Sequence, residues 1–214
     1  MNLALFYDTE TTGLPLFNEP SEDPRQPHIV QLGTSLVDLD TWKTVASLDV
    51  ICRPDGWTIP DDVAAIHGIT TEHALDVGVS EAVAVEMLLG LVGTRTRIAH
   101  NESFDARIVR IACMRHFAMM TRADAWKAGN AECTQLLSTP ILKLPPTAKM
   151  RAVGRHHFKS ANLGEAYQFF TGKPLENAHS AMADVQACIE VYRAIKGGAR
   201  DAASAPVAQP PTTN

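Results

Sequence analysis

The chain has 214 residues, of which 45% are hydrophobic and 20% are charged, and its formal net charge is −5. This length and composition indicate one globular domain with a well-buried core, and the acidic balance argues against a protein that coats nucleic acid indiscriminately, although a local basic groove remains compatible with it. No apolar run approaches the roughly 20 residues that a membrane-spanning helix needs, so we expect no membrane association.

The cysteine pattern and the first residues bear on the compartment. The four cysteines are scattered and form no CxxC pair: Cys52, Cys113, Cys133 and Cys188. This pattern favours reduced, structural thiols over a disulfide framework or a zinc site. The first ten residues reach an acid at position 8 and carry no basic leader, so they do not have the pattern of a signal peptide. We therefore expect a cytoplasmic protein.

The N-terminal part of the chain predicts three strands. Leu3 to Tyr7 is a short continuous apolar run, which is typical of a strand buried on both faces. A Pro-rich, polar surface loop is expected over residues 18–27. His28 to Val37 and Thr44 to Cys52 predict two further strands, joined by a short polar turn. Neighbouring strands with short connections indicate an antiparallel meander.

Helical patterns follow. Glu81 to Val92 predicts a helix, and Thr96 to Ala99 predicts a brief strand. Ser103 is expected to cap a helix that runs to about Met119. Ala131 to Leu137 is expected to form a last edge strand.

The C-terminal part begins with a predicted loop over residues 139–160, which is rich in Pro, Lys, Arg and His. Helices are predicted from Asn162 to about Phe170 and from Ser180 to about Ile195. This order of elements indicates a single mixed-sheet α/β domain over residues 1–196. Residues 197–214 have almost nothing to bury and are expected to form a flexible Ala/Pro-rich tail.

Two acids stand at the end of the first predicted strand. Asp8 and Glu10 are two residues apart, so on an extended chain their side chains point to the same side. The end of a buried strand is where a sheet presents groups to a cleft. The same spacing also occurs in strand-terminating turns whose acids are simply solvated, so the pair has two interpretations.

Two further acids lie on the inward edges of predicted helices. Asp105 shares a helical stripe with Val109, and Asp184 shares one with Cys188. An acid near a helix N-terminus is also stabilised by the helix dipole, so each position alone has a structural explanation. His179 lies five residues before Asp184, and imidazole suits a general base because it titrates near neutral pH.

Taken together, these residues predict a metal site. Acids brought together in a protein interior repel one another, which raises their pKa values unless cations neutralise them. Ligation by oxygen alone favours Mg²⁺ or Mn²⁺ over zinc. The expected metal ligands are Asp8, Glu10, Asp105 and Asp184.

The order of these residues resembles the DEDDh (DnaQ-like) branch of the DEDD superfamily of 3′→5′ exonucleases. The likeness covers residues 3–195 and rests on three segments: FYDTETTGL, AHNESFDARIV and AHSAMADVQACIEVY. A fourth segment, AAIHGIT, resembles the family's His-Gly-Ile segment near the terminal nucleotide. The resemblance implies an RNase H-like fold, a central five-stranded mixed sheet (an antiparallel meander plus parallel strands) flanked by helices.

The resemblance also implies a chemistry. The four acids would hold two Mg²⁺ or Mn²⁺ ions, about 4 Å apart, across the scissile phosphate, and His179 would take a proton from the attacking water. Contacts with the terminal nucleotide are expected from a second set of residues: Thr9, Thr11, Thr12, Leu14, His67 and Phe104. Core packing is the alternative role for Leu14 and Phe104, and a structural turn is the alternative for His67.

The favoured function is a metal-dependent 3′→5′ exonuclease that releases nucleoside 5′-monophosphates from single-stranded or frayed DNA. Proofreading, repair and trimming enzymes share these motifs. One alternative is an RNA-trimming exoribonuclease resembling RNase T or oligoribonuclease, since contacts to the sugar 2′ position are not visible in a sequence. Another is a non-catalytic module that binds nucleic acid or a polymerase.

Two questions about partners stay open. A polymerase partner is compatible with the sequence but unsupported, because residues 197–214 hold no aromatic or large apolar anchor. The basic segment from Lys143 to Lys159 suits either a guide for single-stranded nucleic acid or a solvated loop.

Overall fold

The structure is a computed structural model and describes residues 1–117 and 121–197. Its strands form one sheet in the order β3-β2-β1-β4-β5. β1, β2 and β3 pair antiparallel, whereas β4 is parallel to β1 and β5 is parallel to β4. The expected five-stranded mixed sheet and its meander are therefore confirmed. The strands are β1 (Leu3–Thr11), β2 (Ile29–Asp38), β3 (Lys43–Ile51), β4 (Thr96–Ala99) and β5 (Ala131–Cys133).

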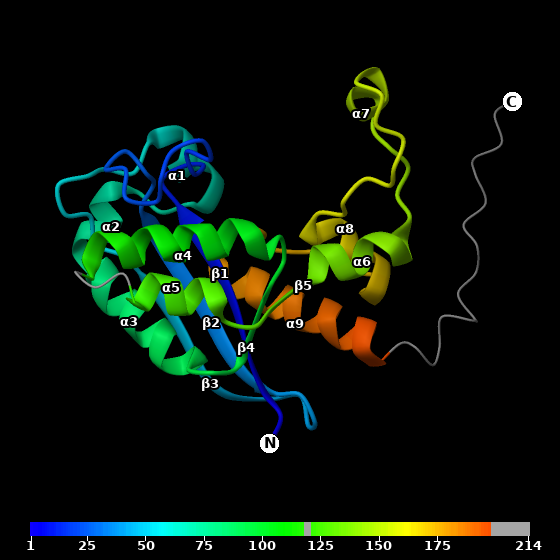
Figure 1. Cartoon of the computed structure of the whole chain (residues 1–214), viewed down its shortest axis with the longest axis horizontal. Coiled ribbons are helices and arrows are strands. Elements are labelled where there is room, and N and C mark those ends of the chain that lie inside the picture. The colour runs from blue at the N-terminus through cyan, green and yellow to red at the C-terminus, as the bar shows by residue number, and fades with distance from the viewer. Residues whose placement is uncertain (118–120, 198–214) are drawn as a thin grey trace, which may run out of the picture.

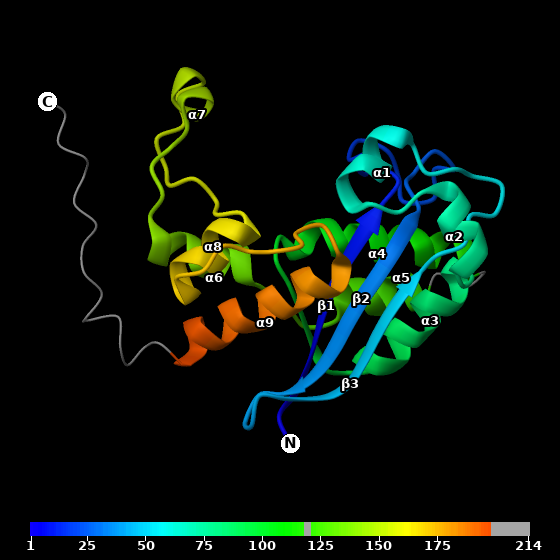
Figure 2. The ribbon, with the colours of Figure 1, turned by 180° about the vertical axis from the view of Figure 1, so that it is seen from behind.

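Helices cover both faces of this sheet (Figures 1 and 2). On one face lie α3, α4 and α5, and α9 crosses the other face with α6 and α8 beside it. The shorter α1, α2 and α7 lie around the edge of these layers. The helices are α1 (Asp61–His67), α2 (Thr71–Val77), α3 (Glu81–Val92), α4 (Glu102–His116), α5 (Thr121–Ala128), α6 (Thr134–Leu142), α7 (Ala148–Ala152), α8 (Leu163–Thr171) and α9 (Ala181–Gly197).

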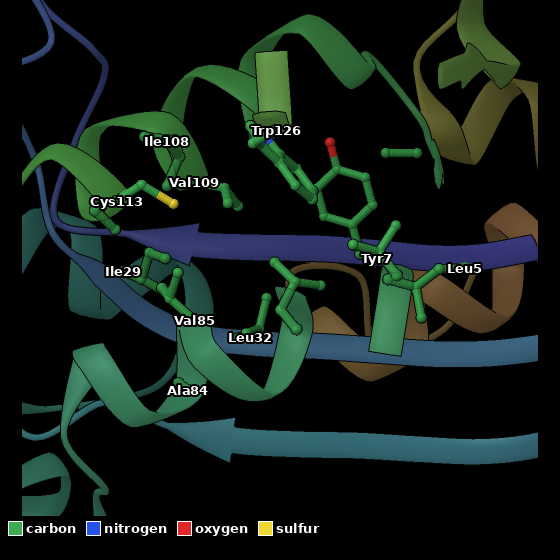
Figure 3. Packing of buried hydrophobic residues seen from close by; sticks show 14 of the residues in the cluster. Leu5, Tyr7, Ile29, Leu32, Ala84, Val85, Ile108, Val109, Cys113 and Trp126 are labelled. Carbon is green, nitrogen blue, oxygen red and sulfur yellow. The ribbon is translucent and has the colours of Figure 1, made fainter. Parts of the chain in front are cut away.

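Side chains of β1 alternate between the two faces and connect both cores. Leu5 and Tyr7 pack against α3, α4 and α5 (Figure 3). The Tyr7 ring meets Trp126 edge to face, with ring centroids 5.4 Å apart. Ala4 and Phe6 pack on the opposite side, against α9. Strand β1 is buried on both faces, as its continuous apolar run predicts.

Several element boundaries differ from the sequence-based predictions. Helix α4 begins at Glu102 after Asn101, whose left-handed backbone (φ 62°) turns the chain, so Ser103 lies inside the helix and is not its cap. The helix ends at His116. The predicted edge strand ends at Cys133, because β4 offers its last partner, Ala99, there. The chain then enters α6.

The region from 139 to 160 is more ordered than a loop. Helix α6 continues to Leu142, and α7 forms farther along, where the Thr147 hydroxyl accepts a hydrogen bond from the Met150 amide. Helices α1, α2 and α5 were not predicted, because each has eight residues or fewer and too short an apolar pattern to stand out. By contrast, α8 has the expected N-terminus, with a capping box between Asn162 and Glu165.

The C-terminal tail predicted over 197–214 lies outside the described residues, except for Gly197, which is the last residue of α9. Among the helices that the structure describes, none has the length and apolar character that a bilayer crossing requires. All four cysteines are free thiols, as their spacing predicts.

Candidate active site

Strand β1 extends beyond its parallel neighbour. It pairs with β4 only from Ala4 to Phe6, so its last residues pass the end of β4. Asp8 and Glu10 lie on this extension, inside the strand and not in the turn after it. By alternation they share the face of Ala4 and Phe6, which is the face that α9 covers.

The last helix brings two more candidate residues to Glu10. Asp184 lies in the first turn of α9, and His179 is exposed on the loop before it. Ligand atoms of Glu10, His179 and Asp184 all lie within 4.8 Å of one another. The Asp184 carboxylate accepts a hydrogen bond from the His179 amide at Oδ2 (3.2 Å), whereas its buried Oδ1 has no partner among the described residues.

Asp105 lies near the same end of β1, against Thr9 on the other face of the sheet, and neither it nor Asp8 belongs to the 4.8 Å group of Glu10, His179 and Asp184. Its carboxylate is 3% exposed, and its Oδ1 accepts two hydrogen bonds from Thr9, at 3.0 Å from the amide and 2.7 Å from the hydroxyl. The Thr9 amide is free to do so because β4 no longer runs beside it. Thr9 thereby fixes Asp105 at the end of β1 through Oδ1.

The pKa values of all four acids are raised, mainly by burial. Burial, together with the charges of Asp105, Asp184 and Glu10, raises the pKa of Asp8 well above its usual value. Burial and the charge of Asp184 raise the pKa of Glu10 to about 6. Burial raises the pKa of Asp105 to about 7, although the hydrogen bonds from Thr9 oppose the rise. Burial also raises the pKa of Asp184. Divalent cations would remove this repulsion.

Two residues of β2 that the sequence-based predictions missed set the start of α9. Gly33 lies opposite Asp8, and Gln31 lies opposite Glu10. A Cβ at Gly33 would stand 2.6 Å from the carbonyl carbon of Ala181, so only glycine lets the helix approach this closely. Gln31 accepts a hydrogen bond from the Ala181 amide at 3.1 Å. A glycine in the middle of a predicted strand was the available signal.

The three threonines predicted to contact a nucleotide use their side chains within the protein. Thr9 bonds to Asp105 on α4. The Thr11 hydroxyl donates to the Gly13 carbonyl at 2.8 Å, and the Thr12 hydroxyl accepts from the His28 amide at 3.0 Å. These bonds hold the turn after β1, so a nucleotide contact at these residues stays a prediction that involves the backbone.

The other three predicted contact residues differ in environment. Leu14 is 74% exposed, whereas Phe104 is half-buried and packs against the main core. The His67 Nδ1 accepts a hydrogen bond from the Ile69 amide at 3.1 Å and so helps to hold the turn after α1. Its Nε2 is buried without a partner in the described part of the chain. Burial, with a smaller contribution from His179, lowers the pKa of His67.

A cavity of about 620 Å³ lies elsewhere, between α3, β4 and α5. Neither the four acids nor His179 line it. The acids converge instead at the open end of β1.

The sheet order and the helices on both faces are those of an RNase H-like fold. A model of the exonuclease family RNase_T matches residues 5–192, so the chain belongs to this exonuclease family. No curated protein matches the sequence.

Solved structures of Escherichia coli exonuclease I share the fold. Its complex with a dT13 oligonucleotide has 20% sequence identity and a TM-score of 0.70, covering 92% of this chain and 41% of that one. The zinc-bound form of its single-stranded DNA complex has 21% identity and a TM-score of 0.69, covering 94% and 41%. Its complex with SSB-Ct has 18% identity and a TM-score of 0.68, covering 92% and 41%. The chain spans about two fifths of the length of these proteins.

Proposed function

We propose that this protein is a metal-dependent 3′→5′ exonuclease that releases nucleoside 5′-monophosphates from single-stranded or frayed DNA. One observation carries the proposal: three segments far apart in sequence bring Asp8, Glu10, Asp105, His179 and Asp184 to one end of β1. Membership of an exonuclease family supports the reaction class. The oligonucleotide complexes of exonuclease I, a protein of similar fold, support DNA as the substrate.

The donor set suits divalent cations. The four acids offer oxygen ligands only, their pKa values are raised, and Asp184 keeps a buried Oδ1 that no described group satisfies. We assign Asp8, Glu10, Asp105 and Asp184 as ligands of two Mg²⁺ or Mn²⁺ ions. When bound, such ions would lower the pKa of the attacking water and neutralise charge that develops on the phosphate oxygens.

His179 is proposed as the general base. Its exposed imidazole stands beside the carboxylates of Glu10 and Asp184, where an imidazolium formed by taking a proton from water would be stabilised. The bond from its amide to Asp184 Oδ2 fixes the backbone of this residue. The base is thereby held next to the acids that would bind the metal ions.

His67 is proposed to hold the terminal nucleotide. Because its Nδ1 accepts the Ile69 amide, the proton of the neutral ring resides on Nε2. This N–H is buried and unsatisfied within residues 1–117 and 121–197, so a sugar or phosphate oxygen of the substrate would complete its bonding. Backbone groups of the turn from Thr9 to Thr12 and the exposed side chain of Leu14 are proposed to complete the subsite.

A digestion time course tests the proposal. Single-stranded DNA labelled at its 5′ end should shorten one nucleotide at a time with Mg²⁺ or Mn²⁺, and the same DNA with a blocked 3′ end should stay intact. Internal cutting of the blocked strand would contradict exonuclease action. An RNA strand of the same sequence that is digested faster would favour the exoribonuclease alternative. Failure to shorten any strand would favour the non-catalytic module. The predicted cytoplasmic location stays a prediction.

A further inference from the structure

One segment has a charge opposite to that of the chain as a whole. The basic arm, residues 143–160, connects α6 to Ala161, just before α8. It holds five of the chain's 19 Lys and Arg residues and none of its 24 acids. Two histidines, His156 and His157, add to it. The five cations are Lys143, Lys149, Arg151, Arg155 and Lys159.

The basic arm projects away from the body of the molecule. Figures 1 and 2 show α7 at its tip, extending beyond the same end of the molecule as α1, the end at which β1 finishes. No side chain of the arm is fully buried, and most are exposed, including Phe158 at 46%. A segment that buries so little contributes little to folding, so its cations are available to a partner.

The base of the arm is nevertheless held to the end of the sheet that carries the acids. The amide of Lys159 donates to the carbonyl of Leu144 at 3.0 Å, which closes the base. The carbonyl of Ala161 lies 3.0 Å from His100 Nε2 and accepts from Gln135 at 3.1 Å. His100 directly follows β4, the neighbour of β1, so the arm is anchored beside the strand end where the acids converge.

Most of the positive charge on the arm is uncompensated. Lys159 is paired with Glu165, and it is the one arm cation with an acid partner in the described part of the chain. The Arg151 guanidinium donates to the carbonyl of Pro146, a neutral group, and therefore keeps its charge. Lys149 and Arg155 are exposed near it, on and just after α7.

We propose that the basic arm binds the single strand leading into the active site, through phosphates on the 5′ side of the terminal nucleotide. The proposal rests on the proposed function, which places the 3′ end at Asp8 and Glu10. Phosphates match unpaired Lys and Arg, and such contacts are independent of base sequence. The arm would then hold the polymer, while the acids would act on its last phosphodiester.

A binding titration tests whether the arm binds the strand. The arm variant carries Lys149→Gln, Arg151→Gln and Arg155→Gln. A control variant loses the same charge at three exposed positions outside the arm: Lys43→Gln, Arg53→Gln and Lys127→Gln. Binding of a fluorescent dT strand of about twelve nucleotides is followed by anisotropy against salt concentration in EDTA, which prevents cleavage. Thermal melts establish that both variants are folded.

The salt dependence gives the answer. The slope of log K against log salt falls by about 0.7 for each phosphate that the protein no longer binds, so the arm variant should have a slope smaller by up to about 2. It should also bind at least about tenfold more weakly at low salt, whereas the control variant should keep the wild-type slope. Equal slopes for the arm variant and the wild type would overturn the proposal, as would an equally reduced slope in the control variant.

A small substrate separates this proposal from the proposed function. Thymidine 5′-(p-nitrophenyl phosphate) has the phosphodiester but no strand for the arm to hold. The arm variant should cleave it at the wild-type rate while its KM for the dT strand rises at least about tenfold. Loss of small-substrate cleavage in the arm variant would overturn a role limited to holding the polymer. If the wild type cleaves neither substrate, the proposed function fails, and the titration in EDTA still decides whether the arm binds the strand.

Discussion

This protein contains two contrasting groups of acids: the single buried residue Glu81, and the four buried or half-buried acids at the end of β1. Glu81, in the first turn of α3, is surrounded by donors: His116 at 2.8 Å, His28 at 2.9 Å, the Ile29 amide at 2.8 Å and, more distantly, Arg115. Although burial opposes it, the hydrogen bonds from His116, His28 and Ile29 lower the pKa of Glu81 to about 2. This carboxylate joins α3, α4 and the start of β2.

The acids at the end of β1 have fewer donors around them, although His179 stands beside Glu10 and Asp184. The donors to Asp105 come from neutral Thr9, and Asp184 receives one backbone amide at Oδ2. These few hydrogen bonds do not offset burial, which raises the pKa values of Asp105 and Asp184. Burial alone therefore does not mark a functional acid. A buried acid with donors around it can stabilise the fold, whereas the acids at the end of β1 are the ones proposed to bind cations from solution.

Asp184→Asn should abolish cleavage. The variant should retain less than about one thousandth of wild-type activity, because the proposed metal site loses a charged ligand. In EDTA its melting temperature should equal or exceed that of the wild type, because a repulsive charge is gone. Mg²⁺ at 100 times its Kd should stabilise the wild type by about 2.7 kcal/mol and the variant much less. A melting temperature below that of the wild type in EDTA would show that Asp184, like Glu81, stabilises the fold.

His179→Ala distinguishes a general base from a metal ligand. Turnover should fall by about 10²–10⁴-fold, because the general base is removed. Mn²⁺ affinity, measured by isothermal titration calorimetry, should stay close to that of the wild type. A parallel loss of Mn²⁺ binding would make His179 a ligand, a role that its distance from Glu10 and Asp184 also permits.

Glu81→Gln tests whether the buried Glu81 carboxylate stabilises the fold. Removing the charge leaves Arg115 uncompensated and weakens the hydrogen bonds from His28 and His116, and breaking a buried pair costs about 3–5 kcal/mol. Urea unfolding measures this loss, while nuclease activity of the folded variant should stay near that of the wild type. Glu86→Gln is the matched control. Glu86 pairs with Arg122 on the surface, so its loss should cost less than about 1 kcal/mol. Equal losses of unfolding free energy in the two variants would show that the buried Glu81 carboxylate stabilises the fold no more than the exposed Glu86 does.

The two groups should also respond oppositely to pH in the absence of metal. Between pH 4 and 7 the folded protein holds more protons on Glu10 and Asp105 than the unfolded chain does, because their folded pKa values are about 6 and about 7. The free energy of unfolding should therefore fall as pH rises through this range. Glu81 contributes the reverse slope between about pH 2 and 4.5. Urea unfolding in EDTA measures both slopes, and Asp105→Asn should flatten the upper one.

The smallest expected effect is that of Thr9→Val, which removes one of the two bonds to Asp105 and keeps the amide. A hydrogen bond to a charged group contributes about 1.5–3 kcal/mol, so kcat should fall by at least about tenfold with KM little changed. Thr9→Ser keeps the hydroxyl and should restore most of the rate. A rise in KM with kcat unchanged would favour the direct nucleotide contact that the family resemblance implies.

Much of this protein was determined by the sequence itself. The apolar run of β1, the helix from Glu81 to Val92 and the strand from Thr96 to Ala99 follow from local periodicity, and the structure has them. The inward stripes of α4 and α9 placed Asp105 and Asp184 on core-facing edges, because helical spacing defines which residues share a face. Part of the acidic site was therefore predictable from spacing alone.

The tertiary structure decided what no local pattern encodes. Gly33 lets Ala181 approach, Thr9 meets Asp105 where β4 ends, and the base of the basic arm is tied to His100. Each of these contacts joins residues far apart in the chain, and each depends on strand register and on where a neighbouring element stops. Sequence periodicity indicates which face of a helix or strand a side chain occupies, whereas only tertiary packing determines which residues that side chain contacts.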